Sequence, residues 1–101
     1  MSNPKDNLVL LKKALVKNPK NISTLIDIAN LHATSNEFFD AAIYFRQLIL
    51  IMNSNEDVKQ GLCFCLIKIG NDYQANRSYM LAKEAFEEAL TYYPNNSDYL
   101  F

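Results

Sequence analysis

A pattern of apolar and small residues occurs twice along this sequence at a fixed offset. The first copy contains Leu25, Ile28, Ala29 and His32, and the second copy contains Lys59, Leu62, Cys63 and Leu66 at the corresponding positions. We call the step from Leu25 to Lys59 the shorter offset. A period of this size, about 34 residues, indicates that one supersecondary unit is repeated, which restricts the fold to a repeat architecture.

A second pattern follows each copy of the first, and its step is longer. Ala41-x3-Phe45 recurs as Ala82-x3-Phe86, and we call the step from Ala41 to Ala82 the longer offset. The second copy therefore carries seven residues more than the first, and we place them in an inserted loop over residues 70–76. The segment 4–17 supplies a partial copy, because Ala14 and Pro19 are spaced as Ala89 and Pro94 are. The sequence thus predicts two full repeats that follow half a repeat.

Apolar spacing and helix breakers predict five helices, over residues 4–17, 22–34, 37–52, 56–69 and 77–92. Asn21 and Asn55 are suited to cap the second and the fourth helix. Gly70 is placed to end the fourth helix as a C-cap glycine. The connections are short, so neighbouring helices are expected to form antiparallel hairpins. The predicted fold class is all-α, with stacked antiparallel helix hairpins, because one hairpin cannot bury both of its faces alone.

A unit of two helices with a period of about 34 residues resembles the tetratricopeptide repeat (TPR). The aligned residues above occupy the slots of that family's signature, and the segment AKEAFEEALTYYP is a good match to its closing part. The resemblance implies a TPR-like α-solenoid forming a single domain over residues 1–101. Its expected parts are a leading capping helix (4–17), the first repeat (22–55), the second repeat (56–96) with the loop 70–76, and a truncated tail (97–101).

Composition and motifs give no support for catalysis or for binding to polyanions. The 101 residues include ten Lys and Arg against eleven Asp and Glu, and the net charge is −1. His32 is the single histidine and is expected to be a packing residue. Cys63 and Cys65 lack the second pair of soft ligands that a zinc site needs, and Cys65 is a candidate for an exposed, oxidisable thiol. We expect no enzymatic activity, no metal or other cofactor, and no nucleic-acid partner.

In TPR proteins the leading helices of successive repeats line a concave groove that accepts extended peptides or helices. The resemblance places seven residues of this chain at such a groove: Ile26, Asn30, Ala33, Gln60, Phe64, Ile67 and Lys68. Phe64 lies off the packing positions of its helix, so its ring is either an anchor for a partner or a contact with a neighbouring helix. The expected function is a non-enzymatic protein–protein interaction module, or adaptor, that binds a peptide or helix of a partner protein.

The C-terminal end of the predicted stack indicates an alternative function. An uncovered end would expose Tyr99, Leu100 and Phe101 as a self-association surface, unless the tail folds back over the fifth helix. Residues 1–20 carry a net charge of +4 and residues 81–101 carry −3, which favours head-to-tail contact between copies. The alternative is a structural scaffold or an assembly subunit of chaperone type that forms homo-oligomers.

No segment of the sequence has the length and apolar character of a signal peptide core or a membrane span. The longest purely aliphatic run covers only residues 48–52. We therefore expect a cytoplasmic protein without a membrane partner.

Overall fold

The computed structural model describes residues 4–52 and 55–93, and within this part of the chain all regular structure is helical. These residues form five helices: α1 (Pro4–Lys17), α2 (Ile22–Thr34), α3 (Phe38–Ile51), α4 (Glu56–Ala75) and α5 (Tyr79–Tyr92). The predicted all-α fold class is confirmed. The bounds of α1 and α2 are those predicted, and the bounds of α3 differ by one residue at each end.

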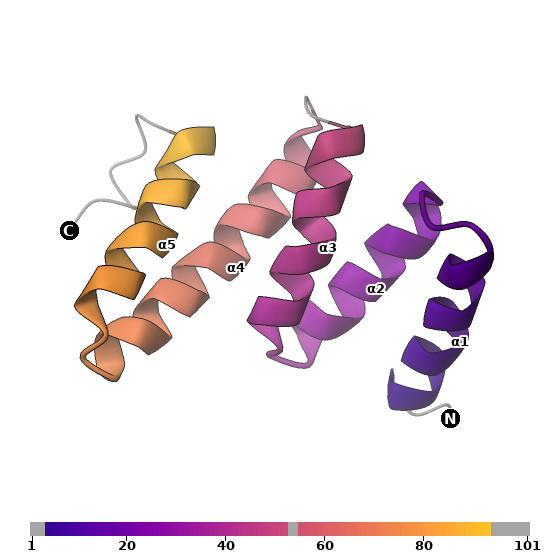
Figure 1. Ribbon diagram of the computed structural model, residues 1–101, viewed down its shortest axis with the longest axis horizontal. Helices are drawn as coiled ribbons and strands as arrows, with labels where there is room; N and C mark the ends of the chain where they lie inside the picture. Colours follow the sequence, from indigo (N-terminus) through magenta and orange to yellow (C-terminus); the bar gives the residue numbers. More distant parts are fainter. Residues whose placement is uncertain (1–3, 53–54, 94–101) are drawn as a thin grey trace.

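The helices are arranged as a row of antiparallel hairpins. Each helix packs mainly against the helices before and after it in the chain. Figure 1 shows them side by side from α1 at one end to α5 at the other, with successive helices running in opposite directions. The described residues thus form a linear stack, in which α1 and α5 each have a helical neighbour on one side only.

Two asparagine side chains start the helices α2 and α4 as the sequence predicted. The side chain of Asn21 accepts a hydrogen bond from the backbone N–H of Thr24 at 3.0 Å. The side chain of Asn55 accepts one from the backbone N–H of Val58, also at 3.0 Å. Each cap satisfies a backbone donor that has no partner within its own helix.

The predicted loop over residues 70–76 is wrong, because α4 continues to Ala75. Gly70 lies inside the helix with an ordinary helical backbone rather than the left-handed one of a C-cap glycine. A Cβ atom at Gly70 would lie 2.7 Å from the ring of Phe86. The glycine is therefore required for close packing of α5 on α4, and Arg77 takes the left-handed position (φ 63°) at the turn.

The turns that end α2 and α4 have the same hydrogen bonds. The N–H of Glu37 donates to the carbonyl of His32 at 2.8 Å, and the N–H of Ser78 donates to the carbonyl of Tyr73 at 2.8 Å. These two turns are therefore related by the longer offset, whereas the asparagine caps at the starts of α2 and α4 are related by the shorter one. The seven extra residues of the second hairpin therefore lie within α4.

An insertion of seven residues keeps the faces of a helix almost unchanged. Seven residues turn a helix by about 700°, which is only about 20° short of two full turns. This explains why α4 has 20 residues and α2 has 13, while both bury one continuous apolar face. It also explains why α2 and α4 align in sequence at the shorter offset, although the turns that follow these two helices are related by the longer offset.

The core is formed by the inward positions of α2 to α5. The residues of these helices that the structure buries include Leu25, Ile28, Ala29, His32, Ala41, Phe45, Leu48, Leu62, Cys63, Leu66, Ile69, Ala82, Phe86 and Ala89. Two aromatic rings lie directly on glycines of α4, since a Cβ atom at Gly61 would lie 2.7 Å from the ring of Phe45, as at Gly70 with Phe86. The small residues of α4 thus let α3 and α5 approach it from two sides.

A polar cluster joins the start of α4 to the end of α5. The hydroxyl of Tyr93 donates to Glu56 Oε2 at 2.7 Å, and Lys59 Nζ lies 3.0 Å from Glu56 Oε1. The hydrogen bond from Tyr93 is the main cause that lowers the pKa of Glu56. Lys59 also lies 5.6 Å from the centroid of the Tyr93 ring. These contacts hold the α4–α5 hairpin together at its open end.

Candidate protein-interaction surface

The seven residues predicted to line a groove come from α2 and α4, and they differ in exposure. Four are exposed: Asn30, Gln60, Phe64 and Lys68. Three are partly buried and pack against the core: Ile26, Ala33 and Ile67. The exposed side chains are the ones that can contact a partner, while the other three support the helices that carry them.

Phe64 packs on one edge and is open on the other. Its ring meets that of Phe38 edge to face, with centroids 5.7 Å apart and planes at 73°. Lys68, one turn further along α4, places Nζ 5.4 Å from the centroid of the Phe64 ring. The side chain of Phe64 remains 51% exposed. The contact with a neighbouring helix that the sequence allowed is therefore present, and the role of the exposed part of the ring as an anchor for a partner stays a prediction.

The Phe64–Lys68 pair combines two kinds of surface. The ring offers an apolar face that is held in place by Phe38, so little conformational freedom is lost when a partner covers it. The ammonium of Lys68 lies beside that face and makes no ion pair with any described residue. The pair is suited to an apolar side chain that is followed or preceded by a carboxylate.

Asn30 lines a cavity to which Phe64 does not belong. A cavity of about 540 Å³ between α1 and α2 is lined by Asn30 together with Leu10, Leu11 and Leu31. Leu10 is 64% exposed there, so the cavity is open to solvent on the α1 side. The structure therefore does not bring Asn30 and Phe64 to one cavity, although the two helices that carry them were predicted to share a groove.

His32 is buried at the turn between α2 and α3. It is 4% exposed, and its ring stacks on Tyr44 with centroids 5.7 Å apart. Its Nδ1 lies 3.2 Å from Glu37 Oε1, while Nε2 has no hydrogen-bond partner among the described residues. Donor atoms of His32, Glu37 and Asp40 lie within 4.8 Å of one another and are the group of described residues that could hold a metal ion. Both carboxylates are exposed at the start of α3, where negative charge also favours the helix dipole.

The two cysteines are buried, so the alternative of an exposed Cys65 is wrong. Cys63 donates a weak hydrogen bond from Sγ to the carbonyl of Ala89 at 3.7 Å. Burial raises the pKa of both thiols to about 11. Both side chains are therefore protonated at neutral pH. Since the thiolate is the reactive form of cysteine, the two thiols are unreactive and serve as small packing residues.

Tyr99, Leu100 and Phe101, the residues predicted for self-association, lie outside the described residues. The outer side of α5 is described, and it holds an apolar cavity of about 480 Å³ lined by Tyr79, Ala82, Phe86 and Leu90 among others. Self-association through this end of the stack stays a prediction.

The sequence reasoning missed an ion pair that joins α3 to α5. Arg46 binds Glu88 through two hydrogen bonds of 2.8 Å, from Nε to Oε2 and from Nη2 to Oε1. It also missed that Tyr73 takes the position before the α4 turn that His32 takes before the α2 turn. Comparing the leading helices at the longer offset, as the trailing ones were compared, would have found Tyr73.

Comparison with known proteins shows a similarity that extends over nearly the whole chain. No family model matches the sequence. The chain is 31% identical over 91 residues to the general transcriptional corepressor trfA of Dictyostelium discoideum. The aligned part is 90% of this chain but 6% of the corepressor, so the chain spans a small part of that protein's length. Within the described residues no helix has the length and apolar character to cross a membrane.

Proposed function

We propose that this chain is a non-enzymatic adaptor built from tetratricopeptide-type hairpins, which binds a segment of a partner protein over α2 and α4. The observation that carries the proposal is the half-exposed ring of Phe64, which Phe38 holds in place beside the ammonium of Lys68. Rigid aromatic side chains next to a charge are typical anchors of protein interfaces.

The longer offset supports the assignment of the repeat type. At this offset the two hairpins correspond residue by residue: Leu25, Ile28, Ala29, His32, Ala41 and Phe45 match Leu66, Ile69, Gly70, Tyr73, Ala82 and Phe86. The order Ile69-Gly70-x2-Tyr73, followed by Ala82-x3-Phe86, has the residue types of the tetratricopeptide signature. A glycine with an aromatic residue three positions later belongs to that signature, and the structure gives Gly70 a packing reason.

The similarity to a corepressor supports an adaptor role in transcription. That protein is named a general transcriptional corepressor, and we propose that this chain also takes part in corepression. The proposed compartment accordingly includes the nucleus as well as the cytoplasm. The preferred partner segment has an apolar side chain next to Asp or Glu, because Lys68 is the charge beside Phe64.

A photo-crosslinking experiment tests the proposal and finds the partner at the same time. A photoreactive residue at the exposed position of Gln60, one turn before Phe64, would capture a protein bound over this part of α4. The same residue at the position of Met80, on the outer side of α5, serves as the control. A partner captured at both positions alike is not bound at the Phe64–Lys68 pair.

The affinity of the captured segment then decides the role of the pair. Phe64→Ala is expected to weaken binding by about tenfold or more, because it removes a central aromatic anchor. Lys68→Glu is expected to weaken binding by about fivefold, because the substitution turns one exposed charge pair into a repulsion. Met80→Ala is the matched control and should bind as the unmodified chain does. Unchanged affinity in both α4 variants, with helicity preserved, would refute the proposed surface.

A further inference from the structure

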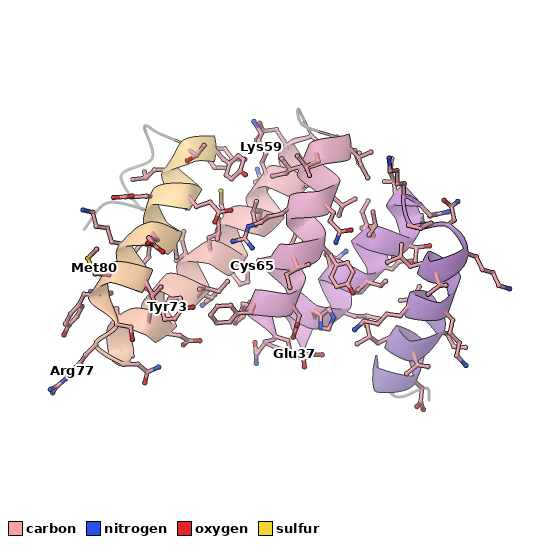
Figure 2. All side chains as sticks on the ribbon, viewed as in Figure 1. Glu37, Lys59, Cys65, Tyr73, Arg77 and Met80 are labelled. Atoms are coloured by element: carbon pink, nitrogen blue, oxygen red, sulfur yellow. The ribbon has the colours of Figure 1, made fainter. Side chains whose placement is uncertain are left out.

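A further cavity lies between α3 and α5, on the side of α4 away from Phe64. It has a volume of about 180 Å³, and we call six of the residues that bound it the α3/α5 socket: Phe39, Leu66, Ile69, Tyr73, Leu81 and Glu84. Leu66 and Ile69 form its apolar floor on α4, while Phe39 and Leu81 stand on α3 and α5 (Figure 2 shows Tyr73 on α4).

The walls of the α3/α5 socket are large apolar side chains that are half open. Phe39 is 51% exposed and Leu81 is 45% exposed. The Phe39 ring meets the Tyr73 ring edge to face, with centroids 5.5 Å apart, so the wall is ordered without being covered. Ile43, one turn after Phe39, is 49% exposed and extends the apolar surface along α3. A contiguous apolar surface around a hollow is typical of a docking site.

The two-turn insertion in α4 accounts for the position of the α3/α5 socket. The ring of Phe45 lies on Gly61, and the ring of Phe86 lies on Gly70. These two contacts are separated by nine residues, or about 13 Å along α4. Since α3 and α5 rest on different segments of α4, the residues between the two contacts form the floor of a hollow that neither helix fills.

The charge at the α3/α5 socket is negative. Arg46 and Glu88 form their paired hydrogen bonds across the same cavity, and the bond to Glu88 is the main cause that raises the pKa of Arg46. These two charges therefore compensate each other. Glu84 also lines the cavity and makes no ion pair with any described residue. A cation placed next to the apolar walls would be the complement of this site.

We infer that the α3/α5 socket is a second docking site, which takes a segment of a partner protein with a bulky apolar side chain next to Lys or Arg. The site is separate from the Phe64–Lys68 pair. Phe64 and Tyr73 are nine residues apart, which is about two and a half helical turns, so their side chains lie on opposite sides of α4. The two sites also prefer opposite charges, since one presents Lys68 and the other Glu84. The chain can thus hold two different segments at once.

Three helical peptides of about 15 residues on an alanine–glutamine framework test this inference. The first carries Leu flanked by Lys, the second carries the same Leu flanked by Glu, and the third carries Ala flanked by Lys. Each is titrated into the isotope-labelled full chain, and binding is followed through the backbone amide signals. The Leu–Lys peptide should shift the signals of Phe39, Tyr73 and Leu81, and the other two should bind at these residues about fivefold and about tenfold more weakly.

Substitutions in the α3/α5 socket sharpen the test. Glu84→Lys should reverse the preference, so that the Leu–Glu peptide binds more tightly than the Leu–Lys peptide. Leu81→Ser should weaken the Leu–Lys peptide by about tenfold while circular dichroism stays unchanged. The matched control is Met80→Ser, because Met80 is exposed on the side of α5 away from α3 (Figure 2).

Four results would overturn the inference. One is that the Leu–Lys and Leu–Glu peptides shift Phe39 and Leu81 to the same extent. Another is that the shifts of the Leu–Lys peptide centre on Phe64. A third is the absence of saturable binding by any peptide at millimolar concentration. The last is that light scattering shows a dimer of the unmodified chain but a monomer of the Leu81→Ser variant. A second copy of the chain would then be the occupant of the socket. If Phe64→Ala did not weaken binding of the partner segment over α2 and α4, the peptide results at the α3/α5 socket would be unchanged. The proposed function and the socket can therefore fail independently of each other.

Discussion

Replacing Phe86 with alanine is expected to lower the free energy of unfolding by about 3–5 kcal/mol. Phe86 is 5% exposed, and its ring fills the space between α5 and the glycine face of α4. Alanine would leave a cavity there, because the backbone of Gly70 offers no side chain that could move into it. The loss is a large part of the stability of a domain of this size, which is about 5–15 kcal/mol. Urea unfolding followed by circular dichroism measures it.

The matched control for Phe86→Ala is Met80→Ala on the same helix. Met80 is 73% exposed, so its truncation should change the free energy of unfolding by no more than about 0.5 kcal/mol. Both variants shorten a large side chain to alanine in α5, and the main difference between the two positions is burial. Equal losses in the two variants would show that α5 does not pack on α4 through Phe86.

The second large effect is expected from Gly70→Leu, which should destabilise the chain by about 2–3 kcal/mol. Leucine favours a helix over glycine by almost 1 kcal/mol, so the same substitution at an unhindered position would raise the free energy of unfolding. Here the Cβ atom alone would approach the Phe86 ring to 2.7 Å, and the rest of the side chain has no room in the contact. Asn71→Leu, at the next and exposed position of α4, is the control that should be neutral or stabilising.

A double-mutant cycle separates a direct clash from a general effect on α4. If Gly70→Leu acts through the ring of Phe86, the loss in the Phe86→Ala background should be smaller by about 1 kcal/mol or more. Additive losses would mean that Gly70 and Phe86 are not in contact. Comparison with the Gly61 and Phe45 pair, which has the same 2.7 Å approach, gives an internal repeat of the experiment on α3.

Much of the fold could be predicted from the sequence, because local signals and burial agree. Asn21 and Asn55 are strong N-caps, and each makes the predicted hydrogen bond to the backbone. The small and large positions of the trailing helices, such as Ala41 and Phe45, are buried as their spacing indicated. Such signals depend on neighbouring residues only, so they can be read without knowing which helices meet.

The length of α4 could not be predicted in the same way. Seven residues preserve the helical face, so the alignment of Ala29 with Cys63 fits the apolar pattern as well as its alignment with Gly70 does. A glycine near the expected end of a helix usually stops it, and nothing local shows that Gly70 lies under an aromatic ring. The deciding contact, with Phe86 sixteen residues later, exists only in the folded chain.

The candidate surfaces were predictable to a smaller degree. The exposure of Phe64 follows from its position off the packing stripe, and the structure gives 51%. The edge contact with Phe38 and the nearby Lys68 depend on how α3 crosses α4. The α3/α5 socket depends on two helices that do not adjoin in sequence, and for that reason no sequence spacing pointed to Phe39 and Leu81 together.

The two α-hairpins of this chain are copies of each other at the longer offset, which takes Ala41 to Ala82, with two additional helical turns in α4. The most direct measurement is the set of nuclear Overhauser contacts of the Phe86 ring. If the hairpins are related in this way, the ring makes strong contacts to the α-protons of Gly70, whose signals are shifted by the ring current, and helical contacts continue through residues 70–75. Contacts from Phe86 to Cys63 without any to Gly70, together with non-helical signals over 70–75, would contradict it.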